Sequence, residues 1–529
     1  MKKILSLIMC TLVAGAVSAQ TVQDATYGTL DFSVDGFAAY EGVKGTAHYL
    51  AGGTTGGKGG DVVSAETFSQ LQAYLQSSKP YIILVTKDIT TNTVCYIDAS
   101  AAKDNICAKQ DGSQGTATTY GERIMVASNK TLIGVPDARG NVPLISRISL
   151  VMQCTHNVII RNLRFTMLNV PVIYSGENKI VAWRQGEQVM LNSDPDCIGI
   201  QADAVSAKKD SGGHIWIDHC EFFNGETNEV DRYDGLIDCK NNIQWMTISY
   251  NLFHDHCKAC LMGKGNSDVF ENCRIFSYHH NYFKHVESPN EKKGSRLPKQ
   301  RGGSLHYMNN YLYQCQDGWD LEVETNSFAD ACYFKDCKAP LIVTQKEGSN
   351  NKLNINSEAD YGIVYDNCKR VIKTPSAGIT YINEPTKYAE EYDISSNVGT
   401  WKPTDVWSDY FVNNRIKATD VPAFCEKYSG AGKIDIWQEY ASSVPAYSQT
   451  NMQAALDSQW TLTKASGTET FKTYDADGNV MTKAPAPTAV DNVNANRNFE
   501  INVKKMLIDG KLVIIKDGKQ FNAAGAQVQ

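Results

Sequence analysis

The chain has 529 residues, of which 42% are hydrophobic and 21% are charged, so it can bury a large apolar core. Its formal net charge of -7 argues against a general nucleic-acid binder, because such proteins carry an excess of basic residues. An acidic ligand would have to be held by a local group of basic residues or by a metal ion.

The N-terminus has the pattern of an export signal. Two lysines precede an apolar run, and small residues lead to a cleavage site that we place after Ala19. No later run is long and apolar enough to span a membrane. We therefore expect residues 1–19 to be removed and the protein to be secreted, whether extracellular, on the cell surface or in the periplasm. Export permits disulfides, and Cys95 and Cys107, which flank a short loop, are the first candidate pair.

Glycine-rich residues 52–59 resemble a phosphate-binding loop. Gly59 stands where that motif needs Ser or Thr, so we expect no nucleotide site. Apolar residues at helical spacing follow in residues 65–75 and predict a short amphipathic helix that caps the N-terminal end of the fold. The apolar run at residues 81–85 predicts a buried strand.

After these elements a strand motif recurs along the chain. In the aligned motifs Cys220, Asn251, Asn281 and Asn310 hold equivalent places, 31, 30 and 29 residues apart. Asn162 lies 58 residues before Cys220, which fits two such steps.

A fixed period of about 30 residues with one strand motif per repeat is typical of a solenoid. The period is too long for short-repeat left-handed helices, and there is too little helix between the motifs for leucine-rich repeats. We therefore predict an all-β fold, a parallel β-helix whose coils stack and whose equivalent asparagines form a hydrogen-bonded ladder. An antiparallel β-sandwich is the alternative.

The pattern changes towards the C-terminus. We assign residues 20–470 to the main domain with its peripheral loops, and residues 471–498, which contain a proline-rich run, to a linker. Two Asp-Gly pairs between apolar runs in residues 499–529 predict a small β-meander. This tail resembles those of many proteins exported by Bacteroidetes, some of which serve as sorting signals.

Three acidic residues are candidate metal ligands. Asp234 and Asp238 lie four residues apart, and Asp203 lies one predicted coil earlier. Stacked coils would bring their carboxylates together without cysteine or histidine, an arrangement that suits Ca²⁺. In the alternative interpretation, Asp234 belongs to an Asp-Gly turn and Asp238 caps the end of a strand.

Residues 254–260 contain two histidines and a Cys-x-x-Cys pair, which could indicate zinc. No second pair follows at the spacing of a zinc finger, so we expect His254 and His256 to make structural hydrogen bonds. Lys258, which lies just beyond His256, is the more interesting candidate.

Arg296 and Arg301 lie five residues apart in a segment with a proline between them and two glycines after them. This composition excludes a helix interior and predicts a loop that leads into a strand. Guanidinium groups match carboxylates in shape and charge. A solvated basic turn is the alternative.

Together these motifs resemble the pectate lyases of polysaccharide lyase family 1. The resemblance covers roughly residues 45 to 320, including the glycine-rich run and residues 128–134. The runs that agree in order and spacing are 216–219, 234–238, 247–253, 256–258, 261–263, 279–283, 296–301 and 306–310.

The resemblance implies a right-handed, single-stranded parallel β-helix that cleaves polygalacturonate by β-elimination, with Ca²⁺ as cofactor. By this match Asp203, Asp234 and Asp238 are the calcium ligands and Arg296 is the catalytic base. Lys258 and Arg301 match the residues that bind the substrate carboxylate during catalysis. We expect a monomer that acts on pectin or polygalacturonate.

Other functions are weighed against this one. A pectin lyase acting on methylated substrate would lack the acidic calcium site. A β-helical hydrolase needs paired carboxylates, and the nearest pair, Asp194 and Asp196, lies in an apparent loop. A surface protein that binds pectin without cleaving it is the alternative outside enzymes.

Overall fold

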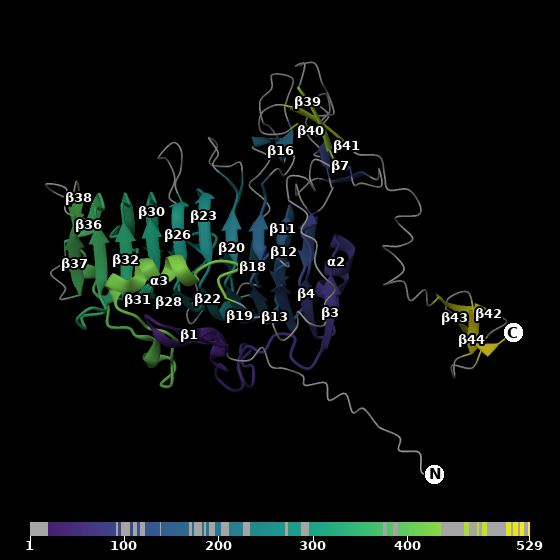
Figure 1. Ribbon diagram of the computed structural model, residues 1–529, viewed down its shortest axis with the longest axis horizontal. Helices are drawn as coiled ribbons and strands as arrows, with labels where there is room; N and C mark the ends of the chain where they lie inside the picture. The colour runs from purple at the N-terminus through teal and green to yellow at the C-terminus, as the bar shows by residue number, and fades with distance from the viewer. Residues whose placement is uncertain are drawn as a thin grey trace, which may run out of the picture.

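The structure is a computed structural model in which the main part of the chain forms an elongated stack of coils (Figure 1). It describes residues 20–90, 122–137, 139–168, 196–202, 211–225, 233–269, 273–286, 296–373, 378–383 and 390–434, and elsewhere the backbone of short strands. The predicted export signal, residues 1–19, lies outside the described residues, as does Asp203.

Three parallel sheets of ten, ten and eight strands run along the stack, and most coils contribute one strand to each sheet. The first sheet contains β3 (Asp61–Ala65), β4 (Tyr81–Val85), β10 (Lys130–Gly134), β13 (His156–Arg161), β19 (Gly212–Asp218), β22 (Ile243–Ser249), β25 (Ile275–His279), β28 (Ser304–Met308), β31 (Asn326–Asp330) and β34 (Lys352–Ile355).

In the middle of the stack, from β13 to β31, a strand of the second sheet follows each strand of the first after a short corner. The second sheet contains β5 (Ile89–Thr90), β11 (Leu144–Ser146), β14 (Arg164–Thr166), β20 (Glu221–Phe223), β23 (Leu252–His256), β26 (Tyr282–Val286), β29 (Tyr311–Tyr313), β32 (Cys332–Lys335), β35 (Ile363–Asp366) and β37 (Ile379–Ile382).

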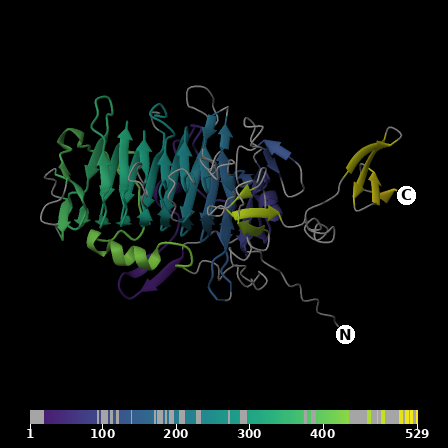
Figure 2. The same cartoon turned by 90° about the horizontal axis from the view of Figure 1, so that it is seen from above.

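The third sheet completes each coil and carries the candidate site. It contains β9 (Glu122–Met125), β12 (Ile148–Gln153), β18 (Ile198–Gln201), β21 (Ile237–Lys240), β24 (Cys260–Met262), β27 (Lys299–Arg301), β30 (Asp317–Val323) and β33 (Ala339–Val343). The view from above shows the coils one behind another along the long axis (Figure 2). The predicted parallel β-helix is confirmed, and the antiparallel sandwich is excluded for this part of the chain.

The corner between the first and second sheets explains the repeated motif. A residue with positive φ turns the chain there, for example His219 (48°), Tyr250 (51°) and His280 (53°). The next residue points inward, and at this place Asn251 Nδ2 donates to Asn281 Oδ1 at 3.1 Å. The predicted asparagine ladder is therefore present.

The ladder continues into the following coil. It does not extend to Asn162 in the earlier coils, although the spacing predicted an equivalent place there. Asn281 Nδ2 donates to Asn310 Oδ1 at 2.9 Å. Asn162 takes the positive-φ corner instead, with φ of 51°. Because β13 pairs directly with β19, the residues between Asn162 and Cys220 form one coil with a long insertion, and the expectation of two coils was wrong.

Apolar and aromatic side chains fill the interior of the coils. Phe165, Phe222, Phe253 and Phe283 stack on one another in successive coils, with ring centroids 5.1, 5.2 and 4.8 Å apart. Such stacking adds to the stabilisation that comes from burying the rings. It also holds neighbouring coils in register.

The N-terminal end of the core is closed by α2 (Phe68–Gln76), as predicted. Leu71 and Leu75 are buried, and the Thr67 hydroxyl caps the helix by accepting a hydrogen bond from the Gln70 backbone. No helix among the described residues has the length and hydrophobicity to cross a bilayer.

Two further segments pack on the outside of the coils. Helix α1 (Gly36–Ala39) crosses the first sheet at β19, β22 and β25, and α3 (Val421–Tyr428) lies against β29 and β32 of the second. The remaining elements there are β1 (Thr21–Asp24), β2 (Gly28–Asp31), η1 (Ser395–Asn397), η2 (Pro403–Asp405) and η3 (Ala418–Asp420). Strands β36 (Arg370–Ile372) and β38 (Glu390–Tyr392) form a parallel pair next to β33 at the end of the stack, and Val371 and Ile372 belong to the main core.

The short strands outside the stack form separate sheets. They are β6 (Val94–Tyr96), β7 (Ile106–Ala108), β8 (Gln114–Thr116), β15 (Val172–Ile173), β16 (Ala182–Arg184), β17 (Glu187–Val189), β39 (Trp460–Lys464), β40 (Thr473–Tyr474) and β41 (Asn479–Lys483). Cys95 and Cys107 are opposite residues of β6 and β7, but their side chains lie outside the described part. Strands β40 and β41 fall within the predicted linker, residues 471–498, whose boundary stays a prediction.

The C-terminal tail forms the antiparallel meander that its Asp-Gly pairs predict. Its four strands are β42 (Lys504–Ile508), β43 (Lys511–Lys516), β44 (Lys519–Asn522) and β45 (Gln527–Val528), each paired with the next.

Candidate active site

The candidate site lies on the outer face of the third sheet. Register pairs place Gly199 of β18 beside Asp238 of β21, Asp238 beside Leu261 of β24, and Leu261 beside Lys299 of β27. Side chains of these neighbouring coils therefore meet, although they are up to 100 residues apart in the sequence.

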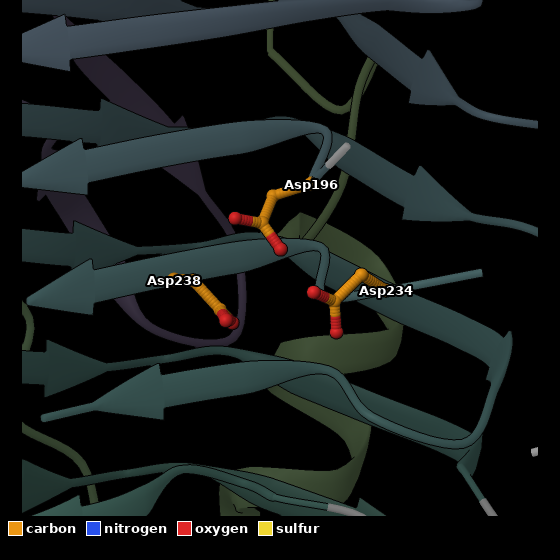
Figure 3. Close-up of side chains that lie close together, drawn as sticks. All are labelled: Asp196, Asp234 and Asp238. Atoms are coloured by element: carbon orange, nitrogen blue, oxygen red, sulfur yellow. The ribbon is translucent and has the colours of Figure 1, made fainter. Parts of the chain in front are cut away.

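Three carboxylates meet at the N-terminal ends of β18 and β21 (Figure 3). Asp196 precedes β18, Asp234 lies in the turn before β21, and Asp238 lies within β21. One ligand atom of each lies within 4.8 Å of the others. The turn itself is tied to the cluster, because the Gly235 backbone N–H donates to Asp196 Oδ1 at 3.0 Å.

Gly235 allows the carboxylates to approach this closely. A Cβ atom at this position would lie 2.2 Å from Asp238 Oδ1 and 3.0 Å from Asp196 Oδ1. Any side chain there would displace the carboxylate of Asp238. The close approach of the carboxylates therefore favours glycine at position 235.

The electrostatics of the cluster favour a bound cation. Burial is the largest cause that raises the pKa of Asp238; Lys240 lowers it and Asp234 raises it further. Lys240 Nζ lies 3.6 Å from a carboxylate oxygen of Asp196 and of Asp238, and Lys258 Nζ lies 3.3 Å from Asp234 Oδ1. Among the described residues, nothing hydrogen-bonds to Asp238 Oδ1, which is buried.

This donor set fits calcium. Oxygen ligands without sulfur or nitrogen are typical of hard cations, and an unsatisfied buried carboxylate oxygen is a natural ligand atom. Among the described residues, the aspartate trio is the one His, Cys, Asp or Glu group close enough together to hold a metal. The structure therefore brings together Asp234 and Asp238, the two residues predicted as calcium ligands on these coils.

Sequence reasoning missed Asp196 and named Asp203 instead. Strand β18 ends at Gln201, so Asp203 follows the strand, whereas Asp196 precedes it as Asp234 precedes β21. The signal that could have found Asp196 is the short apolar strand that it precedes. Because Asp203 lies outside the described residues, its role stays a prediction.

The other candidate residues lie on the next coils. Lys258 is 3% exposed and precedes β24. Arg296 precedes β27, has a φ of 59°, and its carbonyl oxygen accepts a hydrogen bond of 2.8 Å from the Cys260 backbone. The charges of Arg296 and Lys258 both act on Asp238 and lower its pKa, which places the two cations beside the acidic cluster.

Arg301 is held at the C-terminal end of β27. Its Nη1 donates to the Gly263 carbonyl at 2.9 Å and its Nε donates to Asn266 Oδ1 at 3.2 Å. Its Nε also lies 2.5 Å from Glu322 Oε2. Sequence reasoning did not foresee the acidic partner Glu322, because it comes from the next coil.

The zinc interpretation of residues 254–260 finds no support in the described part. His254 lies on the outer face of the second sheet and pairs with Asp255 at 2.7 Å and Glu221 at 3.0 Å, which is the predicted structural role. His256 is buried, and burial together with Lys258 lowers its pKa to about 3. Its side chain is therefore neutral at physiological pH.

Comparison with known proteins agrees with this geometry. A sequence profile described as pectate lyase matches residues 11–467. The pectate trisaccharide-lyase of Bacillus licheniformis is 28% identical over 422 residues, covering 72% of this chain and 100% of that protein. That of Thermotoga sp. strain RQ2 is 28% identical over 312 residues, covering 58% of this chain and 62% of that protein.

A solved structure has the same fold. The thermostable pectate lyase PL 47 is 21% identical in sequence and superimposes with a TM-score of 0.50, covering 79% of this chain and 99% of that chain.

Proposed function

The chain belongs to the pectate lyase family, and from this membership we propose that it cleaves α-1,4-linked polygalacturonate by calcium-dependent β-elimination. The products are 4,5-unsaturated oligogalacturonides. The observation that carries the proposal is the close group of Asp196, Asp234 and Asp238 with Lys258 and Arg296 beside it. A polyanionic substrate needs such cations next to the bond that breaks.

Asp196, Asp234 and Asp238 are the residues that would hold calcium. A bound calcium ion would neutralise the C6 carboxylate of the substrate and so increase the acidity of the neighbouring C5 proton. Asp238 is 2% exposed, which keeps water away from one side of the cluster.

Lys258 and Arg301 bind and orient the substrate carboxylate in this proposal. Lys258 is held by Asp234 at 3.3 Å, so its ammonium group is fixed next to the acidic cluster. The Gly263 carbonyl accepts from Nη1 of Arg301 and Glu322 lies against its Nε, so both contacts fix the guanidinium. A preorganised cation stabilises the negative charge that develops on the carboxylate when C5 loses its proton.

Arg296 is the proposed base. It removes the C5 proton, the electrons of the C5–H bond form the C4=C5 double bond, and the C4–O bond breaks with its electron pair on oxygen. That oxygen then takes a proton from water. Arginine is normally charged, and an arginine acts as a base only after it has lost its proton, so we expect the activity to rise towards alkaline pH.

Mass spectrometry of the products separates this reaction from its alternatives. Elimination gives a new chain end that is lighter by one water than a hydrolysis product. Products with the mass of hydrolysis would contradict the proposal. Binding of polygalacturonate without any product would instead favour the non-catalytic pectin-binding protein.

Export by the predicted signal is also proposed. Two lysines, an apolar run and small residues before Ala19 support it. N-terminal sequencing of the mature protein should begin at Gln20. A mature protein that still begins at Met1 would contradict this.

A further inference from the structure

Four charged side chains, Arg301 among them, form a chain of ion pairs next to Lys258 and Arg296. Lys299 Nζ lies 3.1 Å from Asp320 Oδ2 and 3.4 Å from Glu322 Oε2. Arg301 Nε lies 2.5 Å from the same Glu322 oxygen. We call these residues, Lys299, Arg301, Asp320 and Glu322, the ion quartet.

The ion quartet lies on the outer face of the third sheet. Lys299 of β27 is in register with Asp320 of β30, so the quartet occupies two successive coils. Its side chains remain between 15% and 25% exposed. The aspartate trio, Lys258 and the quartet follow one another along the axis, so a polymer that contacts all of them lies along the axis.

The distance between neighbouring coils is close to the length of one sugar ring. Neighbouring strands lie about 4.8 Å apart, which is close to the length of a pyranose ring in a chain. A polymer centred on Lys258 and Arg296 therefore presents its next rings to β27 and β30. Whether those rings carry a free carboxylate decides how they interact with the quartet.

The charges of the quartet cancel, since it holds two cations and two carboxylates. Lys299 is already engaged by two carboxylate oxygens, and Arg301 is held by Glu322 on one edge. A further carboxylate over β30 would meet Asp320 and Glu322, and like charges at this distance repel. An uncharged ring meets no such repulsion.

We infer that Asp320 and Glu322 of the ion quartet make the surface over β30 selective for a sugar without a free carboxylate, such as a methyl-esterified galacturonate. The inference rests on the proposed function and specifies its substrate as partly esterified pectate. Asp320 and Glu322 are the specificity-determining residues. The free carboxylates that the reaction needs are bound on the preceding coils, at the aspartate trio, Lys258 and Arg301.

The test compares two substrates for the wild type and for Asp320→Asn. The readouts are kcat/KM and binding affinity on fully de-esterified polygalacturonate and on partly methyl-esterified pectin. Removing the Asp320 charge leaves Lys299 able to attract a carboxylate. For each readout, the ratio of the value on polygalacturonate to the value on pectin should therefore rise by about fivefold, and by less at high salt.

A second variant and a matched control keep the test decisive. Glu322→Gln, which retains an acceptor for Arg301, should shift the ratio in the same direction. The control is Asp360→Asn. Asp360 pairs with Lys417 at 3.0 Å and does not belong to the third sheet, so this variant should leave the ratio unchanged. An unchanged ratio in both quartet variants overturns the inference. If the wild type cleaves neither polymer, the proposed function fails, while the affinities still decide the selectivity.

Discussion

At the scale of single residues, the proposed chemistry depends most on Arg296. Its charge acts directly on buried Asp238, and its backbone is anchored to β24 through the Cys260 N–H. We expect Arg296→Lys to lose about a hundredfold or more in kcat, since a lysine cannot place a nitrogen at the same point. Initial rates of double-bond formation measure this.

The control is Arg139→Lys, an exposed arginine on a loop of an early coil, which should keep full activity. Calcium affinity of Arg296→Lys should stay close to that of the wild type, because the arginine is not a ligand. Full turnover in Arg296→Lys would contradict its role as the base.

A second prediction for single residues concerns which aspartate, Asp196 or Asp203, is the third calcium ligand. Asp196 belongs to the described cluster, whereas Asp203 was predicted from the family pattern and is not described. Calorimetric titration with calcium, without substrate, should give an affinity for Asp196→Asn about tenfold or more below that of the wild type. Asp203→Asn is the matched variant and should change it less. The reverse order would restore Asp203 as the ligand.

At the scale of the repeating elements, the asparagine ladder links the coils. Asn281 donates to Asn310 Oδ1 and to the Ile248 carbonyl, and it accepts from Asn251. Asn281→Ala leaves several buried groups without partners, so we expect the free energy of unfolding to fall by about 3 kcal/mol. Denaturant titration measures it.

Gln76→Ala serves as the control, because this exposed amide at the end of α2 should change the free energy of unfolding by less than about 0.5 kcal/mol. A loss that is equally small for Asn281→Ala would mean that the ladder adds no stability.

The element scale also explains which features could be predicted from the sequence. The spacing of Asn251, Asn281 and Asn310 identifies the coils because the corner of each coil needs one positive-φ residue and one inward side chain. The number of coils predicted between Asn162 and Cys220 was wrong, because an insertion of non-repeating sequence there has the length of another coil. A period cannot distinguish an insertion from a coil.

The same limit applied to the site. Asp234, Asp238, Lys258, Arg296 and Arg301 belong to runs with recognisable spacing, and the structure gathers them on neighbouring coils. Asp196 and Glu322 reach the site only through the register of stacked coils. That register depends on pairing between distant segments, which short motifs do not encode.

At the scale of the whole molecule, calcium should couple to stability and pH. Burial is the largest cause that raises the pKa of Asp238 above 3.8. The folded, metal-free protein therefore keeps this proton at a pH where the unfolded chain has lost it, so its stability falls as the pH rises through that window. A cation favours the ionised carboxylate, so the stabilisation by calcium should grow over the same rise in pH.

Thermal unfolding with and without calcium, from about pH 4 to pH 7, measures this growth. In Asp238→Asn the calcium-induced increase in melting temperature should be strongly reduced at every pH, and the metal-free protein should be more stable near neutral pH than the wild type. An increase in melting temperature that shrinks as the pH rises would contradict the role of Asp238.

We propose above all that this β-helix is a calcium-dependent eliminating enzyme. The most direct measurement follows ultraviolet absorbance on polygalacturonate at alkaline pH, first with calcium and then with excess EDTA. We expect rising absorbance from the C4=C5 bond, and this rise should stop when EDTA is added and resume when calcium is restored. New reducing ends without absorbance, or absorbance that EDTA leaves unchanged, would contradict it.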